Sequence, residues 1–385
     1  MRATLGKAAS QGNACALNRS TVSEAQWINT SAGLDDWLAQ LPPHESSAGI
    51  DTEFVRESTF YPRLALLQIA VDDAIALIDP LAFDARALRV WLEAAPRICV
   101  LHSASEDIEV LRDLLPHGLP QLFDTQIAAA FAGLGAGVGY QRLVSDLLAV
   151  ELPKDATRSD WMRRPLSQQQ HTYAVQDVLH LHALREMLEN KLHARGYVDW
   201  FMEDCVRLLR RADAPADAQP QRSFRAAAHW PDSSLARLRA LLLWRDAAAR
   251  RWDVPRAWLL RDEHCADLAL DPPANLTTLE ARTRGQRALR QPVRTELWEH
   301  LQQPIEAAYI EATQRPDDFL KGNARRAFDA MREYVDREAI RLDLPASLMC
   351  PRRGLERYIA AHHWPAELDG WRQGLLQTQL APLLP

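Results

Sequence analysis

The stretch GIDTEFVRESTFYPRLALLQIA, residues 49–70, decides the fold of this chain. Two runs of strand-forming residues flank a polar segment, and this order predicts a β-hairpin. The first run carries Asp51 and Glu53 one residue apart, so both carboxylates are expected on the same face of the strand. Like charges on one face repel each other and cost stability. We therefore expect a positive group between them.

Further strand and helix patterns follow the hairpin and predict a mixed α/β domain that ends near residue 195. The run RICVLHS is continuously apolar up to its end, as in a strand buried on both faces. After it, Ser103 and Glu106 have the spacing of a helix capping box. A short strand and an amphipathic helix are expected at 27–42, further strands at 48–55, 63–71, 74–80 and 97–103, and helices at 84–95, 105–116, 125–133, 140–149 and 167–193.

Length and composition describe a globular protein of two or three domains. The chain has 385 residues, of which 47% are hydrophobic and 25% are charged. Its apolar runs are shorter than the roughly 18 residues that cross a bilayer, and its first 20 residues lack the apolar core of a secretory signal. We therefore expect a cytoplasmic protein without membrane contact. Five scattered Cys residues without a CxxC pair predict neither a disulfide framework nor a zinc site.

Charge is distributed unevenly along the chain. Residues 206–385 hold 28 Lys and Arg against 24 Asp and Glu, whereas residues 1–205 hold 17 against 27. The net charge of -6 argues against a protein that binds nucleic acid over its whole surface. A net-positive C-terminal half nevertheless suits nonspecific attraction of phosphate groups.

Composition also divides the chain into segments. Residues 1–22 are small and polar without periodicity, which predicts a flexible tail. The segment RRADAPADAQPQRS is typical of a linker. After it, a charged helix end, a turn centred on xVP or xLP and a new helix start occur twice, about 90 residues apart. The predicted parts are the tail, an α/β domain at 23–205, a linker at 206–230, and two helical domains at 231–303 and 304–385.

Four acids and a tyrosine stand out in the first domain. Asp51 and Glu53 belong to the hairpin, and Asp107 falls in the first turn of a helix that follows a buried strand. Tyr173 and Asp177 are four residues apart and share one face of a predicted helix. Each has an ordinary explanation, since acids favour helix starts, exposed strands tolerate an acid, and a tyrosine can pack with its hydroxyl at the surface.

Together, carboxylates from one strand and two helices indicate a metal site. Hard divalent cations take oxygen ligands and several negative charges, and they leave positions open for phosphate and water. The positive group expected beside Asp51 and Glu53 is therefore a pair of divalent ions, Mg²⁺ or Mn²⁺.

Three segments in order closely resemble the exonuclease motifs of the DEDD superfamily, in the subgroup whose third motif carries a tyrosine. They are DTEFVR with YPRLALLQIA, then LHSASEDIEVL, then YAVQD. The whole layout is similar to that of bacterial ribonuclease D, in which two HRDC domains follow the nuclease. The resemblance spans roughly residues 25–385. It implies a ribonuclease H-like mixed sheet flanked by helices, followed by two all-α HRDC-like domains.

The resemblance also implies roles for the acids and the tyrosine. Asp51 would contact both ions, Glu53 and Asp177 would bind the ion that holds the attacking water, and Asp107 would bind the other. Two ions about 3.5–4 Å apart stabilise the entering and leaving oxygens of an in-line displacement at phosphorus. Because the ordinary pKa of a tyrosine is about 10, we expect Tyr173 mainly to orient the water and the metal to lower the pKa of that water.

Other residues of these motifs are expected around the substrate. Phe54 offers a stacking face for the terminal nucleotide, with Gln68 beside it in the same slot. His102 suits a packed, hydrogen-bonded histidine as well as a functional one, and Asp124 is expected to support the ligands from behind. Three arginines before the third motif are candidate phosphate contacts or solvated surface charges. They are Arg158, Arg163 and Arg164.

The sequence thus predicts a metal-dependent 3′–5′ exoribonuclease that releases 5′-mononucleotides. The expected partner is RNA, and trimming of the 3′ ends of tRNA precursors or other structured RNAs follows from the resemblance alone. One alternative is a DNA 3′–5′ exonuclease of the same superfamily, since the acids do not recognise the sugar. The other is a non-catalytic RNA-binding protein with a degenerate nuclease domain. Two helical modules in one chain can substitute for a partner subunit, so a monomer is expected.

Overall fold

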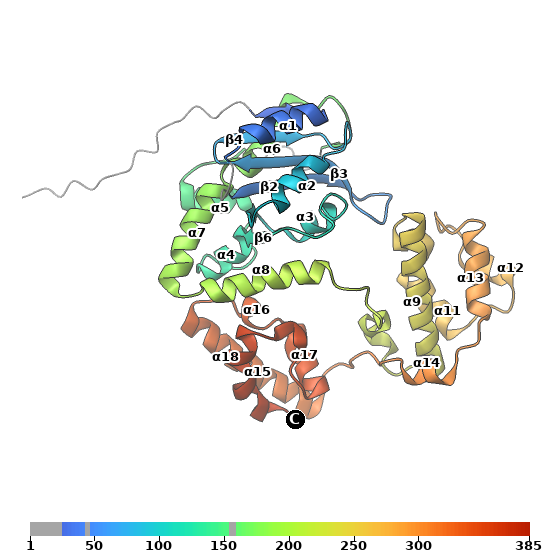
Figure 1. Cartoon of the computed structure of the whole chain (residues 1–385). Helices are drawn as coiled ribbons and strands as arrows, with labels where there is room; N and C mark the ends of the chain where they lie inside the picture. The colour runs from blue at the N-terminus through green and yellow to red at the C-terminus, as the bar shows by residue number, and fades with distance from the viewer. Residues whose placement is uncertain (1–24, 43–46, 154–158) are drawn as a thin grey trace, which may run out of the picture.

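The computed structural model describes residues 25–42, 47–153 and 159–385. Within them, one mixed sheet has the strand order β1-β4-β3-β2-β5-β6 (Figure 1). β3 runs antiparallel to both of its neighbours, and the other pairs are parallel. This arrangement confirms the predicted mixed α/β fold. The strands are β1 Gln26–Ile28, β2 Ala48–Val55, β3 Arg63–Val71, β4 Ala74–Ile78, β5 Ile98–Leu101 and β6 Gln121–Asp124.

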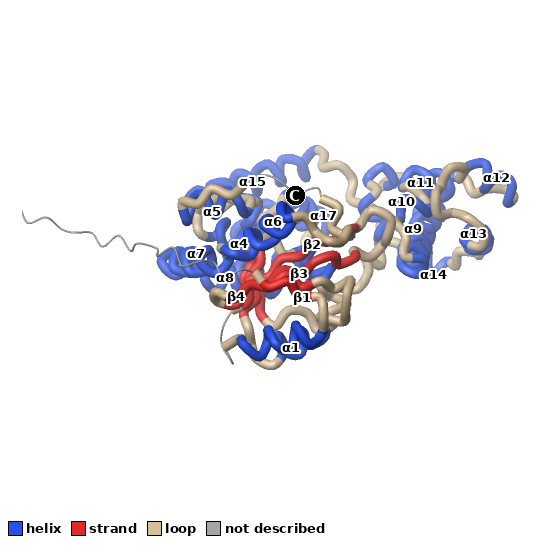
Figure 2. The backbone as a smooth tube through the Cα atoms, turned by 90° about the horizontal axis from the view of Figure 1, so that it is seen from above, coloured by secondary structure: helices blue, strands red, loops and turns tan. Residues whose placement is uncertain are grey.

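Helices cover both faces of the sheet. α1 and α6 lie on opposite sides of the strands in the view from above (Figure 2). α6 packs on β2, β3 and β4, and α7 packs on β2 and β5, so these two helices cover the face that carries Asp51 and Glu53. The helices of this part are α1 Ser31–Gln40, α2 Arg86–Glu93, α3 Ser105–Val110, α4 Thr125–Phe131, α5 Tyr140–Leu148, α6 Gln168–Leu179, α7 Leu181–Arg195 and α8 Val198–Ala212.

The central hairpin follows from its sequence. Every residue of β3 from Ala65 to Val71 is buried, as its apolar run predicts. Asp51 of β2 lies opposite Gln68 of β3, and the register shifts between Glu53 and Phe54. A register shift of this kind bends a strand and redirects the side chains that follow it. The extra residue is Ala65 of β3, which has no partner between the pairs Glu53–Leu66 and Phe54–Leu64. The distortion therefore lies in the strand that pairs with the one carrying the acids.

Two elements differ from the prediction. β6 was not expected, because its four residues are too few for a period to show. The helix predicted at 167–193 is two helices, α6 and α7, which are separated at His180. The Tyr140 hydroxyl donates to the carbonyl of Gln176 and accepts from the amide of His180, so a side chain from α5 satisfies backbone groups where the helix is interrupted.

The C-terminal region is helical and repeats its own outline, as predicted. Each module has a helix of 21 residues, a four-residue helix and then a third helix. The first module comprises α9 Asp232–Trp252, α10 Arg256–Leu259, α11 Asp262–Leu270, α12 Leu276–Arg282, α13 Val293–Gln302 and α14 Ala307–Glu311. The second comprises α15 Gly322–Leu342, α16 Ala346–Met349, α17 Arg352–Ala361 and α18 Trp371–Leu380. We call these modules the first and second helical domains.

The two helical domains attach to the rest of the chain in different ways. The first has its own buried cluster, which also takes in Phe60 from the hairpin. The second shares one continuous buried cluster with the α/β part and lies beneath α8 (Figure 1). The predicted boundary at 205 falls inside α8. The predicted boundary at 303 places α14 in the second helical domain, although α14 packs on α9 of the first. The predicted tail, 1–22, lies outside the described residues.

Candidate active site

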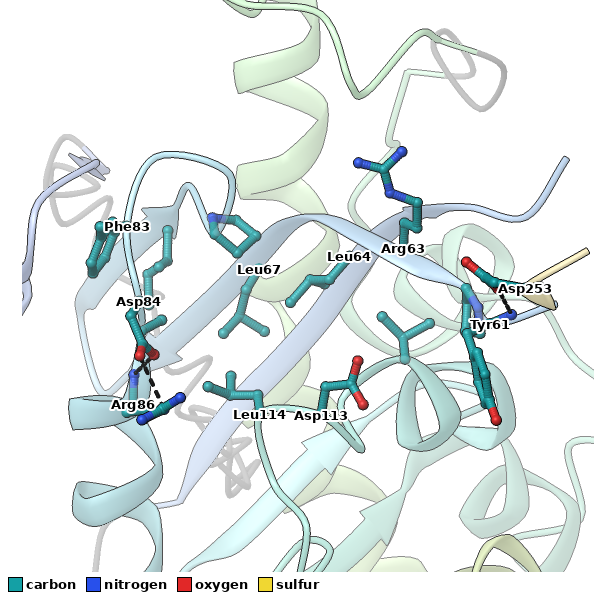
Figure 3. A pocket seen from close by; sticks show the side chains of 15 residues that line it. Tyr61, Arg63, Leu64, Leu67, Phe83, Asp84, Arg86, Asp113, Leu114 and Asp253 are labelled. Atoms are coloured by element: carbon teal, nitrogen blue, oxygen red, sulfur yellow. Dashed lines mark hydrogen bonds and ion pairs between the residues drawn. The ribbon is translucent and has the colours of Figure 1, made fainter. Parts of the chain in front are cut away.

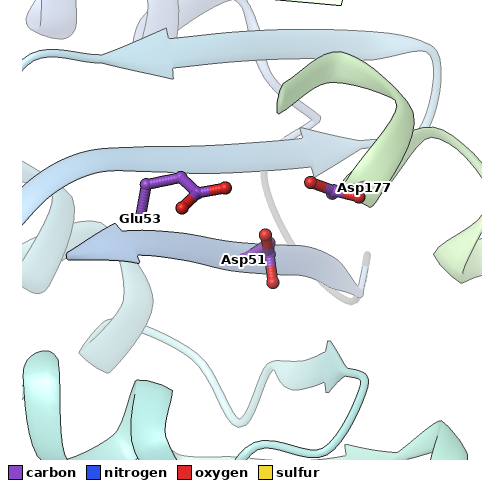
Figure 4. A group of neighbouring side chains, drawn as sticks. All are labelled: Asp51, Glu53 and Asp177. Carbon is purple, nitrogen blue, oxygen red and sulfur yellow. The ribbon is translucent and has the colours of Figure 1, made fainter. Parts of the chain in front are cut away.

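Asp51, Glu53 and Asp177 come together beside β2 (Figure 4). One carboxylate oxygen of each residue lies within 4.8 Å of those of the other two. Asp51 and Glu53 extend from β2, and Asp177 reaches them from α6, which packs on this strand. Side-chain alternation along β2 and the packing of one helix thus bring acids 126 residues apart in sequence into one cluster.

Asp107 is the fourth acid and approaches from α3. Its side chain is buried, and its Oδ1 atom accepts a hydrogen bond of 2.5 Å from the hydroxyl of Thr52. Because side chains alternate along β2, Thr52 points to the face opposite Asp51 and Glu53. Its bond to Asp107 shows that α3 packs on that face. The charge of Asp107 raises the pKa values of Asp51 and Glu53. All four acids therefore belong to one electrostatic group.

Burial is the first cause of a raised pKa at each of the four carboxyls. It raises the pKa of Glu53 to about 8, that of Asp177 to about 7 and that of Asp107 to about 6. The pKa of Asp51 is well above its ordinary value because of burial and then because of the charges of Asp107, Asp177 and Glu53. Among the described residues, no Lys or Arg opposes these shifts. A divalent cation would offset the desolvation and repulsion of such a group.

Tyr173 borders the acids on the helix that carries Asp177. α6 begins with a capping box in which Ser167 and Gln170 bond to each other's backbone amides. One turn later, the phenol of Tyr173 lies close enough to Asp177 for each group to shift the pKa of the other. The Oδ2 atom of Asp177 is buried and has no hydrogen-bond partner among the described residues. An unpartnered buried carboxylate oxygen is suited to binding a metal ion.

Asp124 lies behind the acids, at the end of β6. Its carboxylate accepts hydrogen bonds from the amides of Ser103 and Ala104, just before α3, and from those of Gln126 and Ile127, at the start of α4. The predicted capping by Ser103 is wrong, because Ser103 has φ 61° and Ala104 is the N-cap residue. Asp124 therefore fixes the start of the helix that carries Asp107, which agrees with a supporting position.

His102 is packed in the same layer. Its Nδ1 atom lies 2.9 Å from the hydroxyl of Thr125, and its ring meets that of Tyr140 edge-on at 5.6 Å. Burial lowers the pKa of His102, which favours the neutral imidazole. The geometry fits a structural histidine.

Two of the residues expected around the substrate are not available to contact it. Gln68 is completely buried, so it lines no open slot in this structure. Arg164 donates from Nε and Nη2 to both oxygens of buried Asp79, at 2.7 and 2.8 Å, and from Nη2 to the carbonyl of Ala65. Its charge is thereby neutralised within the fold, and we withdraw it as a phosphate contact.

The remaining expected contacts have different positions. Phe54 is partly exposed on β2, and Arg163 is exposed in the segment before α6. Arg158 lies outside the described residues. Sequence reasoning missed Thr52, although its place between two acids of one motif was the available signal. It also missed Arg56, which binds the carboxylate of Glu109 at 2.7 and 2.8 Å.

Comparison with known proteins decides the family. A family model of 3′–5′ exonucleases matches residues 25–193. Ribonuclease D of Xanthomonas oryzae pv. oryzae is 38% identical over 364 residues, which are 93% of this chain and 98% of that protein. The chain belongs to the ribonuclease D family. Ribonuclease D of Pseudomonas paraeruginosa is 34% identical over 92% of this chain and 96% of its own length.

A solved structure agrees with this assignment over almost the whole chain. The crystal structure of Escherichia coli RNase D, reported as an exoribonuclease involved in structured RNA processing, matches with a TM-score of 0.78 at 28% identity. It covers 93% of this chain and 98% of the other. As a ribonuclease D, this chain is an enzyme, a hydrolase of the 3′–5′ exoribonuclease type, with a DEDD nuclease domain followed by a helical C-terminal region. No helix in the described part of the chain is long and apolar enough to span a membrane.

Proposed function

We propose that this ribonuclease D removes nucleotides from the 3′ end of RNA with two divalent metal ions, Mg²⁺ or Mn²⁺, and releases 5′-mononucleotides. The proposal depends on one observation: three carboxylate oxygens lie within 4.8 Å of one another in a group of acids whose pKa values are all raised. The bound ions would neutralise the acids and polarise the scissile phosphate.

The electrostatics support a central position for Asp51. Its pKa responds to the charges of Asp107, Asp177 and Glu53 together, so we assign it to both ions. Glu53 and Asp177 share the first ion with it, because their oxygens cluster with those of Asp51. Asp107 holds the second ion from the side of α3, where Thr52 fixes one of its oxygens.

Tyr173 orients the attacking water in this proposal. Burial, and then the charges of Asp177, Glu53 and Asp51, raise its pKa above the ordinary value of about 10. The phenol therefore keeps its proton and acts as a hydrogen-bonding group. Its position on the same helix face as Asp177 keeps the hydroxyl beside the acids. Phe54 and Arg163 are proposed to contact the terminal base and a phosphate, because both side chains are at least partly exposed.

The proposed substrates are tRNA precursors and other structured RNAs with 3′ extensions. The support is the similarity to the Escherichia coli enzyme, which was reported to process structured RNA. Such substrates place the proposed enzyme in the cytoplasm. We also propose that it is a monomer, because both helical domains of one chain already pack against its nuclease domain. Light scattering on the purified protein distinguishes one chain of 43.5 kDa from a dimer.

A time course on 5′-labelled single-stranded RNA and on DNA of identical sequence tests the proposal. The reactions contain Mg²⁺, Mn²⁺ or a chelator, with the Asp51→Asn variant alongside. A ladder that shortens from the 3′ end of RNA, requires metal and is absent with the variant is expected. Equal or faster shortening of the DNA would favour the DNA exonuclease. No shortening with either metal would favour a binding protein with an inactive nuclease domain.

A further inference from the structure

The tip of the β2–β3 hairpin is inserted into the first helical domain. Phe60, in the loop between the two strands, is only 6% exposed and belongs to the buried cluster of that domain. The nearest strand residue in the register is Arg63, so the phenyl ring is buried outside the nuclease core. An aromatic residue in a loop is normally buried by its own domain, and here another domain supplies the pocket.

A charged clamp surrounds the inserted ring. The guanidinium carbons of Arg250 and Arg256 each lie 4.7 Å from the centroid of Phe60. Both arginines bind the carboxylate of Asp246, Arg250 at 2.8 Å, so one acid holds the two cations against the same ring. Cation–π contacts of this kind stabilise the position of the ring.

Asp253 adds directional bonds to this contact. Its Oδ1 atom accepts the backbone amides of Phe60 at 2.9 Å and of Tyr61 at 3.0 Å, and Figure 3 shows this carboxylate beside Tyr61. Asp253 is the left-handed residue that ends α9, with φ 46°. Two bonds to consecutive amides fix the backbone of the hairpin tip as well as the ring.

The contact continues toward the metal-binding acids. Arg56, three residues after Glu53, donates from Nε and Nη2 to the carbonyl of Phe60 at 3.2 and 3.1 Å. The same guanidinium binds both oxygens of Glu109 on α3, two residues from Asp107. One network therefore joins the first helical domain to β2 and to α3, the two elements that carry Asp51, Glu53 and Asp107.

A pocket lies beside this part of the hairpin. On the face opposite the acids, Leu64 and Leu67 line an open pocket of about 690 Å³ (Figure 3). Tyr61 and Asp253 lie at the rim of the same pocket. Leu64 is partly exposed at this pocket, so contacts at the tip help to hold this end of the hairpin.

The second helical domain has an aspartate equivalent to Asp253, but this residue contacts a different part of the nuclease domain. Asp343 ends α15 with φ 50°, two residues before a proline, as Asp253 ends α9. Its carboxylate binds Arg195, at the end of α7, at 2.7 Å. The beginning of α7, next to Asp177, is 14 residues or roughly 20 Å away along the helix. Both repeats thus dock on the nuclease domain through one equivalent aspartate, but only the first does so at the catalytic hairpin.

We propose that the first helical domain holds the catalytic hairpin in its working position, with Phe60 and Asp253 as positioning residues for Asp51 and Glu53. The inference rests on the proposed function, because it concerns the geometry of the same acids. It assigns the first helical domain a part in the chemical step, in addition to any contact with RNA.

Two matched variants test the inference in the full chain. Asp253→Gly and Asp343→Gly each remove one docking carboxylate, and glycine accepts both left-handed backbones without strain. Phe60→Ala removes the inserted ring, and Phe60→Leu keeps an apolar group there. The measurements are kcat and KM on a short RNA that reaches only the active site, the half-saturating Mn²⁺ concentration, and Tm.

Asp253→Gly and Phe60→Ala are expected to lower kcat by about tenfold or more, since small displacements of catalytic groups cost up to about a hundredfold. Both should raise the half-saturating Mn²⁺ concentration, and Phe60→Leu should largely restore it. Asp343→Gly should lower Tm and leave kcat and the Mn²⁺ response unchanged. The inference is wrong if Asp253→Gly and Phe60→Ala behave as Asp343→Gly does.

The proposed function and the inference fail in different ways. Wild-type protein that shortens no RNA would remove the proposed function. Mn²⁺ binding, measured by electron paramagnetic resonance on the same variants, would then still decide the inference: weaker binding by Asp253→Gly than by Asp343→Gly supports it, and equal binding contradicts it. If Phe60→Ala does not fold, Asp253→Gly decides the outcome alone.

Discussion

At the scale of single residues, the acids are arranged for metal binding at a cost in stability. The folded protein holds protons on Glu53, Asp177 and Asp107 up to pKa values of about 8, 7 and 6, whereas unfolded Asp and Glu titrate near pH 4. The contribution of these protonated carboxyls to the stability of the fold is therefore complete below about pH 4. It is lost as the pH rises through about 6–8, where the carboxyls ionise in the folded protein. Each pKa unit corresponds to about 1.4 kcal/mol.

This sign predicts how the metal-free protein responds to pH. In chelator, Tm should fall between pH 5.5 and pH 8.5, and Asp51→Asn should raise Tm at pH 8.5 because it removes one buried charge. At pH 5.5 the difference between variant and wild type should shrink. Mg²⁺ or Mn²⁺ should stabilise the wild type more at the higher pH and should stabilise the variant less. An Asp51→Asn protein with a lower Tm than wild type in chelator at pH 8.5 would contradict this account.

The Asp51→Asn variant also tests the proposed role of this acid in activity. Asp51→Asn should lower kcat by more than about a hundredfold. Loss of a group that only hydrogen-bonds to a metal ligand costs up to about a hundredfold, and loss of a ligand itself should cost more. Substitution of a structural acid would lower both stability and activity. A variant that gains stability and loses activity therefore identifies Asp51 as a functional acid. Parallel melting and single-turnover assays measure the two effects.

Tyr173→Phe tests the orienting hydroxyl. The change keeps the ring, which packs 6.0 Å from that of Trp161, and removes the hydroxyl beside Asp177. We expect kcat to fall by about a hundredfold or more, the range for losing one preorganised hydrogen-bond donor, while KM and Mn²⁺ affinity change little. A variant that retains wild-type kcat would exclude the hydroxyl from the reaction.

Local spacing in the sequence predicted residues that the fold brings together, such as Asp51, Glu53 and Asp177. It could not predict residues whose partner is distant in the sequence. Asp51 and Glu53 alternate on a strand, and Tyr173 and Asp177 share a helix turn, so local periodicity places each pair. Arg164 is different, because its partner Asp79 is 85 residues away. No local pattern distinguishes such an arginine from one that binds phosphate.

At the scale of elements, Asp124 connects β6 to two helices. Its carboxylate accepts four backbone amides, from Ser103, Ala104, Gln126 and Ile127. Each buried amide left without a partner costs about 1–3 kcal/mol. Asp124→Ala should therefore lower the free energy of unfolding by several times more than Asp84→Ala, which removes one bond to the amide of Arg86 and an exposed ion pair with the side chain of the same residue.

Asp124→Asn gives the sharper measurement of this prediction. An asparagine oxygen can still accept the three amides that reach Oδ1, whereas its NH₂ group would face the amide of Ala104. We expect an intermediate loss of stability, with reduced activity because α3 begins at this point and carries Asp107. Chemical denaturation and kcat on the three variants check the order. Equal stability of Asp124→Ala and Asp84→Ala would refute it.

Long periodic elements were predictable, and short ones were not. The hairpin strands and the helices of 21 residues show their periods clearly, but β6 has four residues and depends on its pairing with β5. The break between α6 and α7 depends on a hydroxyl from α5. The start of α3 depends on Asp124 and not on its local capping signal. In each case tertiary contacts override local preference.

At the scale of the whole molecule, the two helical domains differ in how they join the nuclease domain. The second shares its buried core with the nuclease domain, whereas the first has a separate core. Trp200 of α8 stacks on Trp371 of the second domain, with ring centroids 4.6 Å apart and planes at 10°. Beside them, Arg372 binds both oxygens of Asp204 at 2.5 and 2.6 Å, and both side chains are buried. The first helical domain has its separate buried cluster and meets the hairpin at Phe60.

This difference predicts two steps in thermal unfolding. The α/β part and the second helical domain should melt together because their buried cluster is continuous, and the first helical domain should melt separately. Asp204→Asn leaves Arg372 buried beside a neutral group, and breaking a buried pair in this way costs about 3–5 kcal/mol. The variant should therefore lower the Tm of the joint transition and leave that of the first helical domain unchanged.

Calorimetry of the full chain separates these outcomes, with Asp204→Leu combined with Arg372→Met as the control. Replacing both partners by apolar groups of similar size is often neutral or stabilising. The double variant should nevertheless recover only part of the lost Tm, because the indole of Trp371 and the carbonyl of Leu348 also lose their bonds. A single transition that shifts as a whole with Asp204→Asn would show that the contacts at Phe60 and Asp253 couple the first helical domain fully to the rest. In that case Asp253→Gly should split the transition into two, because it removes the bonds that hold the hairpin tip.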